Sequence, residues 1–126
     1  MSSRPIIAVA ALAAALSVSA CGSTTGEFAL TCSTEGARNV QESPISSTLS
    51  GTLDTGQNDV GTCQTADAVV RGVTASAAEK PVTVDGFRCT PSVVSTGPDV
   101  VKWSCNFKGA DTDTDVTLRF EATYRG

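Results

Sequence analysis

The segment "GFRCTPSVVSTGPDVVKWSCNF", Gly86–Phe107, decides the fold because it contains two strand-like runs joined by a turn. The turn cluster "STGPD", Ser95–Asp99, separates the two runs. If Gly97 lies at the centre of this turn, residues whose numbers sum to 194 face each other. These pairs are all apolar: Phe87 with Phe107, Cys89 with Cys105, Pro91 with Trp103, and Val93 with Val101. Because a buried face selects strand register, the segment predicts an antiparallel hairpin.

The same apolar face continues into a third strand beyond the sequence "GADTD". A four-residue loop, Ala110–Asp113, pairs residues whose numbers sum to 223. The resulting pairs are again apolar: Phe107 with Val116, Cys105 with Leu118, Trp103 with Phe120, and Val101 with Ala122. We therefore predict a three-strand meander in which the aromatic residues form core and not a ligand cage.

Opposed cysteines in the hairpin predict the first of two disulfides. Directly opposite residues in a non-hydrogen-bonded pair lie about 4.5 Å apart at Cα, within the range of a disulfide. We therefore favour Cys89–Cys105, which leaves Cys32 and Cys63 for the second bond. Pro91 cannot donate a ladder hydrogen bond, so its strand should lie at an edge or be bulged, and a shifted register would allow another of the three pairings.

The remaining segments predict one helix and further strands. Between Thr62 and Pro81, small apolar residues recur at helical spacing, with Thr62 or Thr65 as the cap and Pro81 as the stop. The apolar positions are Ala66, Val69, Val70, Val73 and Ala77. Alternating apolar residues around 28–32 and 45–53 predict strands. The fold class is α+β: a small antiparallel sheet, made of the C-terminal meander and one or two N-terminal strands, covered by one amphipathic helix and crosslinked by two disulfides.

The N-terminus has the organisation of a secretory signal peptide. A single basic residue, Arg4, precedes thirteen mostly apolar residues, Ile6–Val18. As a helix these residues rise about 20 Å, less than the hydrocarbon core of about 30 Å. The segment is therefore too short to span a membrane, and we expect residues 1–20 to be removed.

The end of this segment, "VSAC", resembles the lipobox of bacterial lipoproteins, in which an aliphatic residue and two small residues precede a cysteine. The resemblance implies that Cys21 receives a diacylglyceryl group, that cleavage occurs before it, and that the protein is anchored at the outer face of a bacterial membrane. Residues 21–27 would then be the lipidated cysteine with a flexible tether, and 28–126 a single domain. An ordinary cleaved signal and a buried helix are the alternatives.

Charge and motifs limit the classes of function. The net charge is −4, and removal of residues 1–20 makes it −5 because only Arg4 is lost. Without a Lys/Arg cluster in the sequence, neither nucleic acid nor anionic headgroups are expected as partners. The chain has no histidine, its cysteines lack zinc or redox spacing, and no catalytic motif is present, so we expect no metal, no cofactor and no enzyme activity.

Two polar features are candidate sites. The cluster "DTDTD", Asp111–Asp115, resembles the start of a calcium loop, but Val116 and Ala122 stand where glycine and a bidentate glutamate are required, so we predict a polar hairpin tip. The outward side chains of the meander form a mixed-sign surface, either plain solvated sheet or a recognition surface. Its candidate recognition residues are Arg88, Lys102, Arg119 and Glu121.

Residues 61–126 also resemble small exported domains of actinobacterial type, on the segments "TCQTADAVV", "GFRC" and "KWSC". This resemblance implies a disulfide-containing α+β domain and no particular chemistry. We predict a cell-envelope lipoprotein that acts as a non-catalytic binding, scaffold or shielding module toward an envelope protein or ligand. The alternative is a metal-dependent enzyme or enzyme inhibitor that uses the polar sheet face or the Asp111–Asp115 tip.

Overall fold

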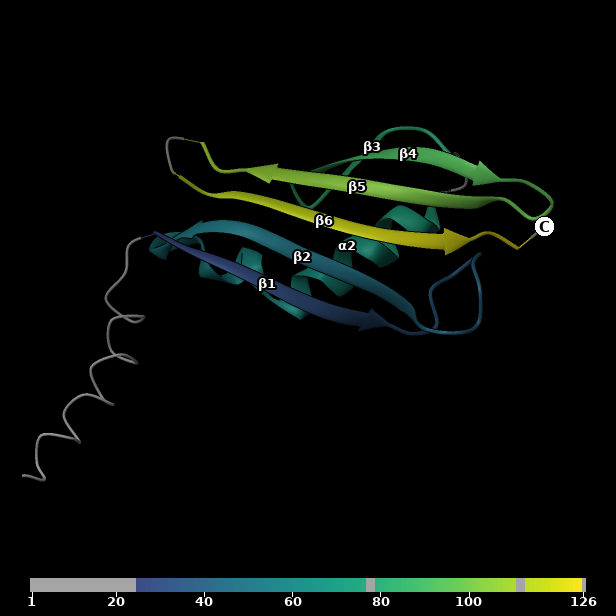
Figure 1. Ribbon diagram of the computed structural model, residues 1–126, viewed down its shortest axis with the longest axis horizontal. Helices are drawn as coiled ribbons and strands as arrows, with labels where there is room; N and C mark the ends of the chain where they lie inside the picture. Colours follow the sequence, from purple (N-terminus) through teal and green to yellow (C-terminus); the bar gives the residue numbers. More distant parts are fainter. Residues whose placement is uncertain (1–24, 77–78, 111–112, 126) are drawn as a thin grey trace, which may run out of the picture.

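The protein forms one antiparallel six-stranded sheet with a helical layer on one face and the other face uncovered (Figure 1). The computed structural model describes residues 25–76, 79–110 and 113–125; the predicted leader 1–20, Cys21, Ala77 and Asp111 lie outside them. The spatial strand order is β1-β2-β6-β5-β4-β3. The elements are β1 (Thr25–Thr34), β2 (Ile45–Asp54), the 3-10 helix η1 (Thr55–Gly61), α2 (Cys63–Ala75), β3 (Val82–Val84), β4 (Phe87–Ser95), β5 (Val100–Lys108) and β6 (Asp115–Thr123).

The meander β4-β5-β6 has the register that the apolar pairs predict. Cys89 lies opposite Cys105, and Trp103 lies opposite both Pro91 and Phe120. A bulge between Val93 and Ser95 then shifts the last β4 pairing. Val93, predicted to face inward, lies immediately before this bulge and is 46% exposed, although its partner Val101 is fully buried.

The sheet differs from the expected one in its number of strands and in where its first strand begins. The sheet has six strands instead of four or five, because β3 pairs with the first three residues of β4. Its sequence "VTV" is too short for alternation to be recognised. Strand β1 begins at Thr25, so the last three residues of the predicted tether 21–27 belong to the sheet. They do so because β2 extends to Asp54 and supplies their pairing partners.

Helix α2 begins and packs as its sequence predicts. Thr62 is the N-cap, and its side chain accepts a hydrogen bond from the backbone N–H of Thr65 at 3.1 Å. The helix ends at Ala75, well before the predicted stop at Pro81, because the Ser76 N–H turns back to the Val73 carbonyl. The apolar stripe of α2 is fully buried against the sheet: Ala66, Val69, Val70 and Val73.

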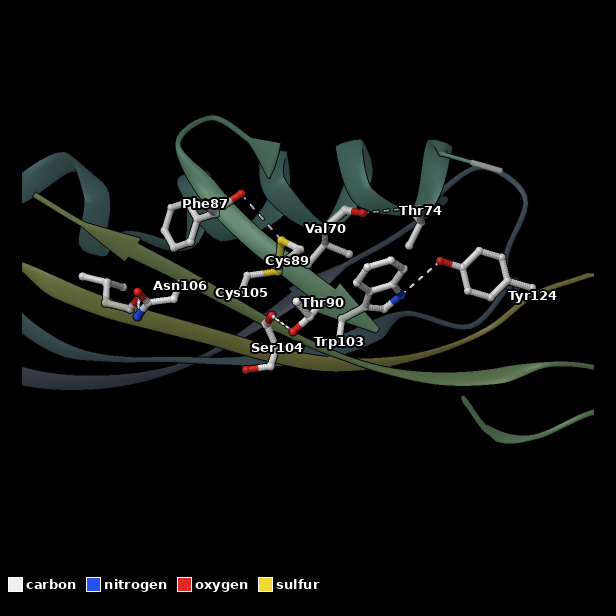
Figure 2. Close-up of a disulfide and its surroundings, with 11 residues drawn as sticks. Val70, Thr74, Phe87, Cys89, Thr90, Trp103, Ser104, Cys105, Asn106 and Tyr124 are labelled. Atoms are coloured by element: carbon white, nitrogen blue, oxygen red, sulfur yellow. Dashed lines mark hydrogen bonds between the residues drawn. A yellow bond between two sulfur atoms is a disulfide. The ribbon is translucent and has the colours of Figure 1, made fainter. Parts of the chain in front are cut away.

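Two disulfides crosslink this core in the predicted pairing. Cys89–Cys105 joins β4 to β5 with a Cα–Cα distance of 3.9 Å, and both residues are fully buried (Figure 2). Cys32–Cys63 joins β1 to the first residue of α2, with a Cα–Cα distance of 5.4 Å. Closing loops of these lengths stabilises a domain by roughly 3–4 kcal/mol each in the chain-entropy model.

Candidate functional site

The uncovered face of the sheet is almost entirely polar. Strand alternation sends the apolar side chains toward α2 and every second residue outward. Figure 2 shows this division, with Trp103 on the side of α2 and Ser104 on the opposite side. We define the polar face by the outward side chains of β2, β6, β5 and β4: Ser46, Thr48, Ser50, Thr52, Arg88, Thr90, Ser92, Lys102, Ser104, Asn106, Lys108, Asp115, Thr117, Arg119 and Glu121.

The structure brings the four predicted recognition residues onto this one face. Arg88 lies on β4, Lys102 on β5, and Arg119 and Glu121 on β6, and all four are exposed. Lys102 is directly opposite Glu121, as expected. Among the described residues, however, the only ion pairs within 4.0 Å lie elsewhere, so this pair is in register without forming a salt bridge.

Electrostatics distinguish the two ends of the polar face. At one end Asp115 is held by Asn106, whose Nδ2 donates to Oδ1 at 2.9 Å, and by Lys108, whose Nζ is 3.6 Å from Oδ2. The Asn106 hydrogen bond, and next the charge of Lys108, lower the pKa of the Asp115 carboxyl. In contrast, no described carboxylate lies within salt-bridge distance of Arg88 or Arg119. Their positive charges remain available to a ligand.

The polar face is hollowed between β4 and β5. An open hollow of about 530 Å³ is lined by Gly86, Arg88, Thr90, Ser104, Asn106 and Lys108. Its wall offers a guanidinium, an ammonium and hydroxyl groups, and Asn106 supplies an amide already bonded to β6. This set of groups suits an anionic, hydroxyl-bearing ligand better than an apolar one.

The acidic hairpin tip is tied into the sheet. The Asp113 carbonyl accepts a hydrogen bond from Thr52 Oγ1 at 2.9 Å, and the buried Thr114 hydroxyl accepts one from the Asp54 N–H at 2.8 Å. Residues 25–76, 79–110 and 113–125 contain no group of three or more His, Cys, Asp or Glu arranged to hold a metal ion. Asp111 lies outside these ranges.

A second polar cluster lies at the β4–β5 turn and was not predicted. Glu79, Asp99 and Tyr124 line a hollow of about 510 Å³. The main cause that raises the pKa of Glu79 is the hydrogen bond that its protonated carboxyl donates to the Asp99 carboxylate, followed by burial and the Asp99 charge. Burial raises the pKa of Tyr124, whose hydroxyl accepts a hydrogen bond from Trp103 Nε1 at 3.1 Å (Figure 2). Three separate segments supply these residues, and no local motif links them.

Comparison with known proteins finds no matching family model and no match among curated proteins or solved structures. Within the described part of the chain, none of the helices has both the length and the apolar character needed to cross a membrane. The function is therefore inferred from the residues and geometry of this chain.

Proposed function

We propose that this protein is a membrane-anchored cell-envelope lipoprotein whose folded domain is a non-catalytic binding module. Two features support the proposal: the lipobox-like "VSAC" sequence, which ends at Cys21, and a domain with two disulfides. The polar face is the binding surface, because it is broad and uncovered and carries Arg88 and Arg119, which have no carboxylate of the described residues within salt-bridge distance.

The disulfides support an exported location. Such bonds persist outside the reducing cytoplasm, and small exported domains use them to compensate for a small core. Here Cys32–Cys63 fixes β1 to the start of α2, and Cys89–Cys105 crosslinks the centre of the meander. In an oxidising compartment these two bonds persist and hold β1 to α2 and β4 to β5.

The anchor would hold the domain close to the membrane. Each methylene buried in the bilayer contributes about 0.8 kcal/mol to membrane binding. One acyl chain therefore binds reversibly, whereas two anchor the protein stably. Strand β1 begins only four residues after Cys21, a span of at most about 14 Å. The sheet would therefore stand just above the headgroups, with its polar face free for a ligand in the envelope.

The observation that carries the proposal is the cysteine at position 21 after the apolar segment. Cys21→Ala should block processing and release the protein from membranes, measured by fractionation and intact mass. Ser23→Ala is the matched control, since it changes the same junction and keeps the thiol. A Cys21→Ala variant that fractionates like the wild type, or a native product with an uncut leader or an unacylated cysteine, would refute the anchor.

A further inference from the structure

We propose that the polar face binds a polyhydroxylated polyanion, with one acidic group in the hollow beside Arg88 and another near Arg119. This inference rests on the proposed function, because it names the ligand class of the same surface. It follows from three properties of the face: its charge, its hydrogen-bonding groups and the absence of aromatic side chains.

The β4–β5–β6 part of the polar face is basic, whereas the whole chain is acidic. Four of the nine basic residues lie on it, against the two acidic residues Asp115 and Glu121. The segment 54–85, which contains η1, α2 and β3, carries five acidic and two basic residues. Asp54 at the end of β2, and Glu27 opposite Thr52 on β1, take outward positions near the β1 edge of the uncovered face. Asp59 and Asp67 lie in the helical layer on the other side of the sheet. Since sheet and helix layers are about 10 Å thick and the Debye length is about 8 Å in physiological salt, their repulsion of a ligand on the polar face is screened.

The spacing of Arg88 and Arg119 allows each to contact a different acidic group of one polymer. Arg88 is opposite Asn106, Asn106 is opposite Thr117, and Arg119 is the next outward residue along β6. Sheet geometry therefore separates the Arg88 and Arg119 Cα atoms by about 12 Å. Two guanidinium groups at this separation can bind acidic groups on two different units of one chain, and a second ionic contact of this kind strengthens the binding of a polymer over that of a single anion.

The groups between the two arginines are suited to hydroxyl-bearing units. Thr90, Ser104 and Arg119 lie opposite one another on adjacent strands, and the row continues to Thr48 on β2. Ser and Thr hydroxyls donate and accept, as the hydroxyls of a sugar or polyol do. The cations therefore select acidic groups, and the rows of hydroxyls contact the units between them.

The same face lacks the aromatic side chains that single-stranded nucleic acids and many protein partners use. All six aromatic residues of the chain are described, and none lies on the polar face. Single-stranded nucleic acids bind through aromatic stacking, and Trp and Tyr are two of the main anchors of protein interfaces. A surface of hydroxyls and cations with an open hollow beside Arg88 instead fits an acidic glycan or a polyol phosphate.

The test is a binding titration of the full-length chain in detergent micelles. The probes are polygalacturonate, which carries carboxylates, and poly(glycerol phosphate), which carries phosphodiesters; neutral dextran and single-stranded DNA are the comparison ligands. Arg88→Ser/Arg119→Ser removes the two unpaired cations. Arg38→Ser/Lys80→Ser removes two exposed cations outside the polar face and is the matched control.

We expect at least one polyanion to bind, with an affinity that falls as the salt concentration rises. This affinity should fall at least tenfold in the double Arg variant and stay unchanged in the control. Binding of only one polyanion identifies the acidic group. Ser104→Glu, on the central exposed row, should weaken binding as well without loss of fold.

Three results would overturn the proposal: no binding to either polyanion, equal loss in the control, or binding of dextran or DNA as tight as that of the polyanions. These outcomes are distinct from failure of the anchor. If no polyanion binds but the protein is membrane-bound and acylated at Cys21, the proposed function stands and only the ligand class is wrong. If a polyanion binds but Cys21 is not acylated, only the anchor is wrong.

Discussion

Replacing Gly72 with alanine tests how closely α2 packs against β3. In a helix interior this exchange normally stabilises by about 1 kcal/mol, because glycine loses more backbone entropy on folding. At this position a Cβ atom would lie 2.6 Å from Val84 Cγ1 and 3.3 Å from Cγ2. Carbon atoms pack at about 3.5–4.0 Å, so the added methyl group overlaps the valine side chain.

The magnitudes decide the sign of the effect. Overpacking costs about 1–3 kcal/mol, and the stiff β-branched side chain of Val84 has few rotamers with which to move away. We expect Gly72→Ala to destabilise the wild-type domain by about 1 kcal/mol. In the Val84→Ala background both Cγ atoms are gone, so the same exchange should stabilise by about 1 kcal/mol. The double-mutant coupling is then about 2 kcal/mol.

The assay is urea unfolding without reductant, followed by fluorescence of the buried Trp103. Ala68→Gly, at an exposed position of the same helix, is the control and should cost about 1 kcal/mol in both backgrounds. Equal stabilisation by Gly72→Ala with and without Val84 would show that α2 and β3 are not in close contact.

Three further predictions concern the core and the β4–β5 turn. The buried Thr34 hydroxyl has no hydrogen-bond partner among the described residues, so Thr34→Val should raise the free energy of unfolding by about 1 kcal/mol; a loss in urea unfolding would reveal a partner. Gly51 has φ 142°, and its Cβ would collide with the Asp115 carbonyl, so Gly51→Ala should cost about 3 kcal/mol or more, and wild-type stability would contradict this contact. Because the pKa of Glu79 is raised, the stability that its protonated form adds is fully present below the unfolded-state pKa of 4.5 and is lost as pH rises through the folded-state pKa. Asp99→Asn should reduce this pH dependence of the free energy of unfolding, measured from pH 3 to 7. An unchanged pH dependence would show that Glu79 and Asp99 do not interact.

The sheet could be predicted from the sequence where its apolar residues alternate over a long stretch. Cys89, Trp103 and Leu118 fall on one face only in the correct register, so a one-residue error would expose them to solvent. The three residues of β3 provide no such constraint. Its pairing depends on the turn at Asp85 and Gly86, which have φ values of 50° and 84°.

The candidate sites, too, could be predicted only in part from the sequence. The polar face was predictable, because the register that buries Trp103 also turns Lys102 and Ser104 outward. The cluster of Glu79 and Asp99 was not, because it depends on how the segment after α2 meets the β4–β5 turn. A long-range contact between two irregular segments leaves no periodic pattern in the sequence.

The edge of the sheet is a less favourable binding surface than its face. Strand β4 is paired by β3 only up to Cys89, and the rest of the strand lies at the edge. Cys89 and Cys105 form a close pair, so residues of the same parity, including Pro91, direct their backbone groups outward. Proline has no N–H to offer there, and the bulge after Val93 twists the strand further, so addition of another strand is hindered.

Alternation along β5 and β6 also separates stability from recognition. In β5 the odd-numbered residues Val101, Trp103 and Cys105 are buried, and the even-numbered residues between them are exposed. Exposed substitutions without buried partners usually change stability by less than about 0.5 kcal/mol. A change such as Ser104→Glu therefore alters the charge of the polar face while the core packing beneath it is retained. Loss of polyanion binding in that variant, at unchanged unfolding free energy, would have to arise at the surface itself.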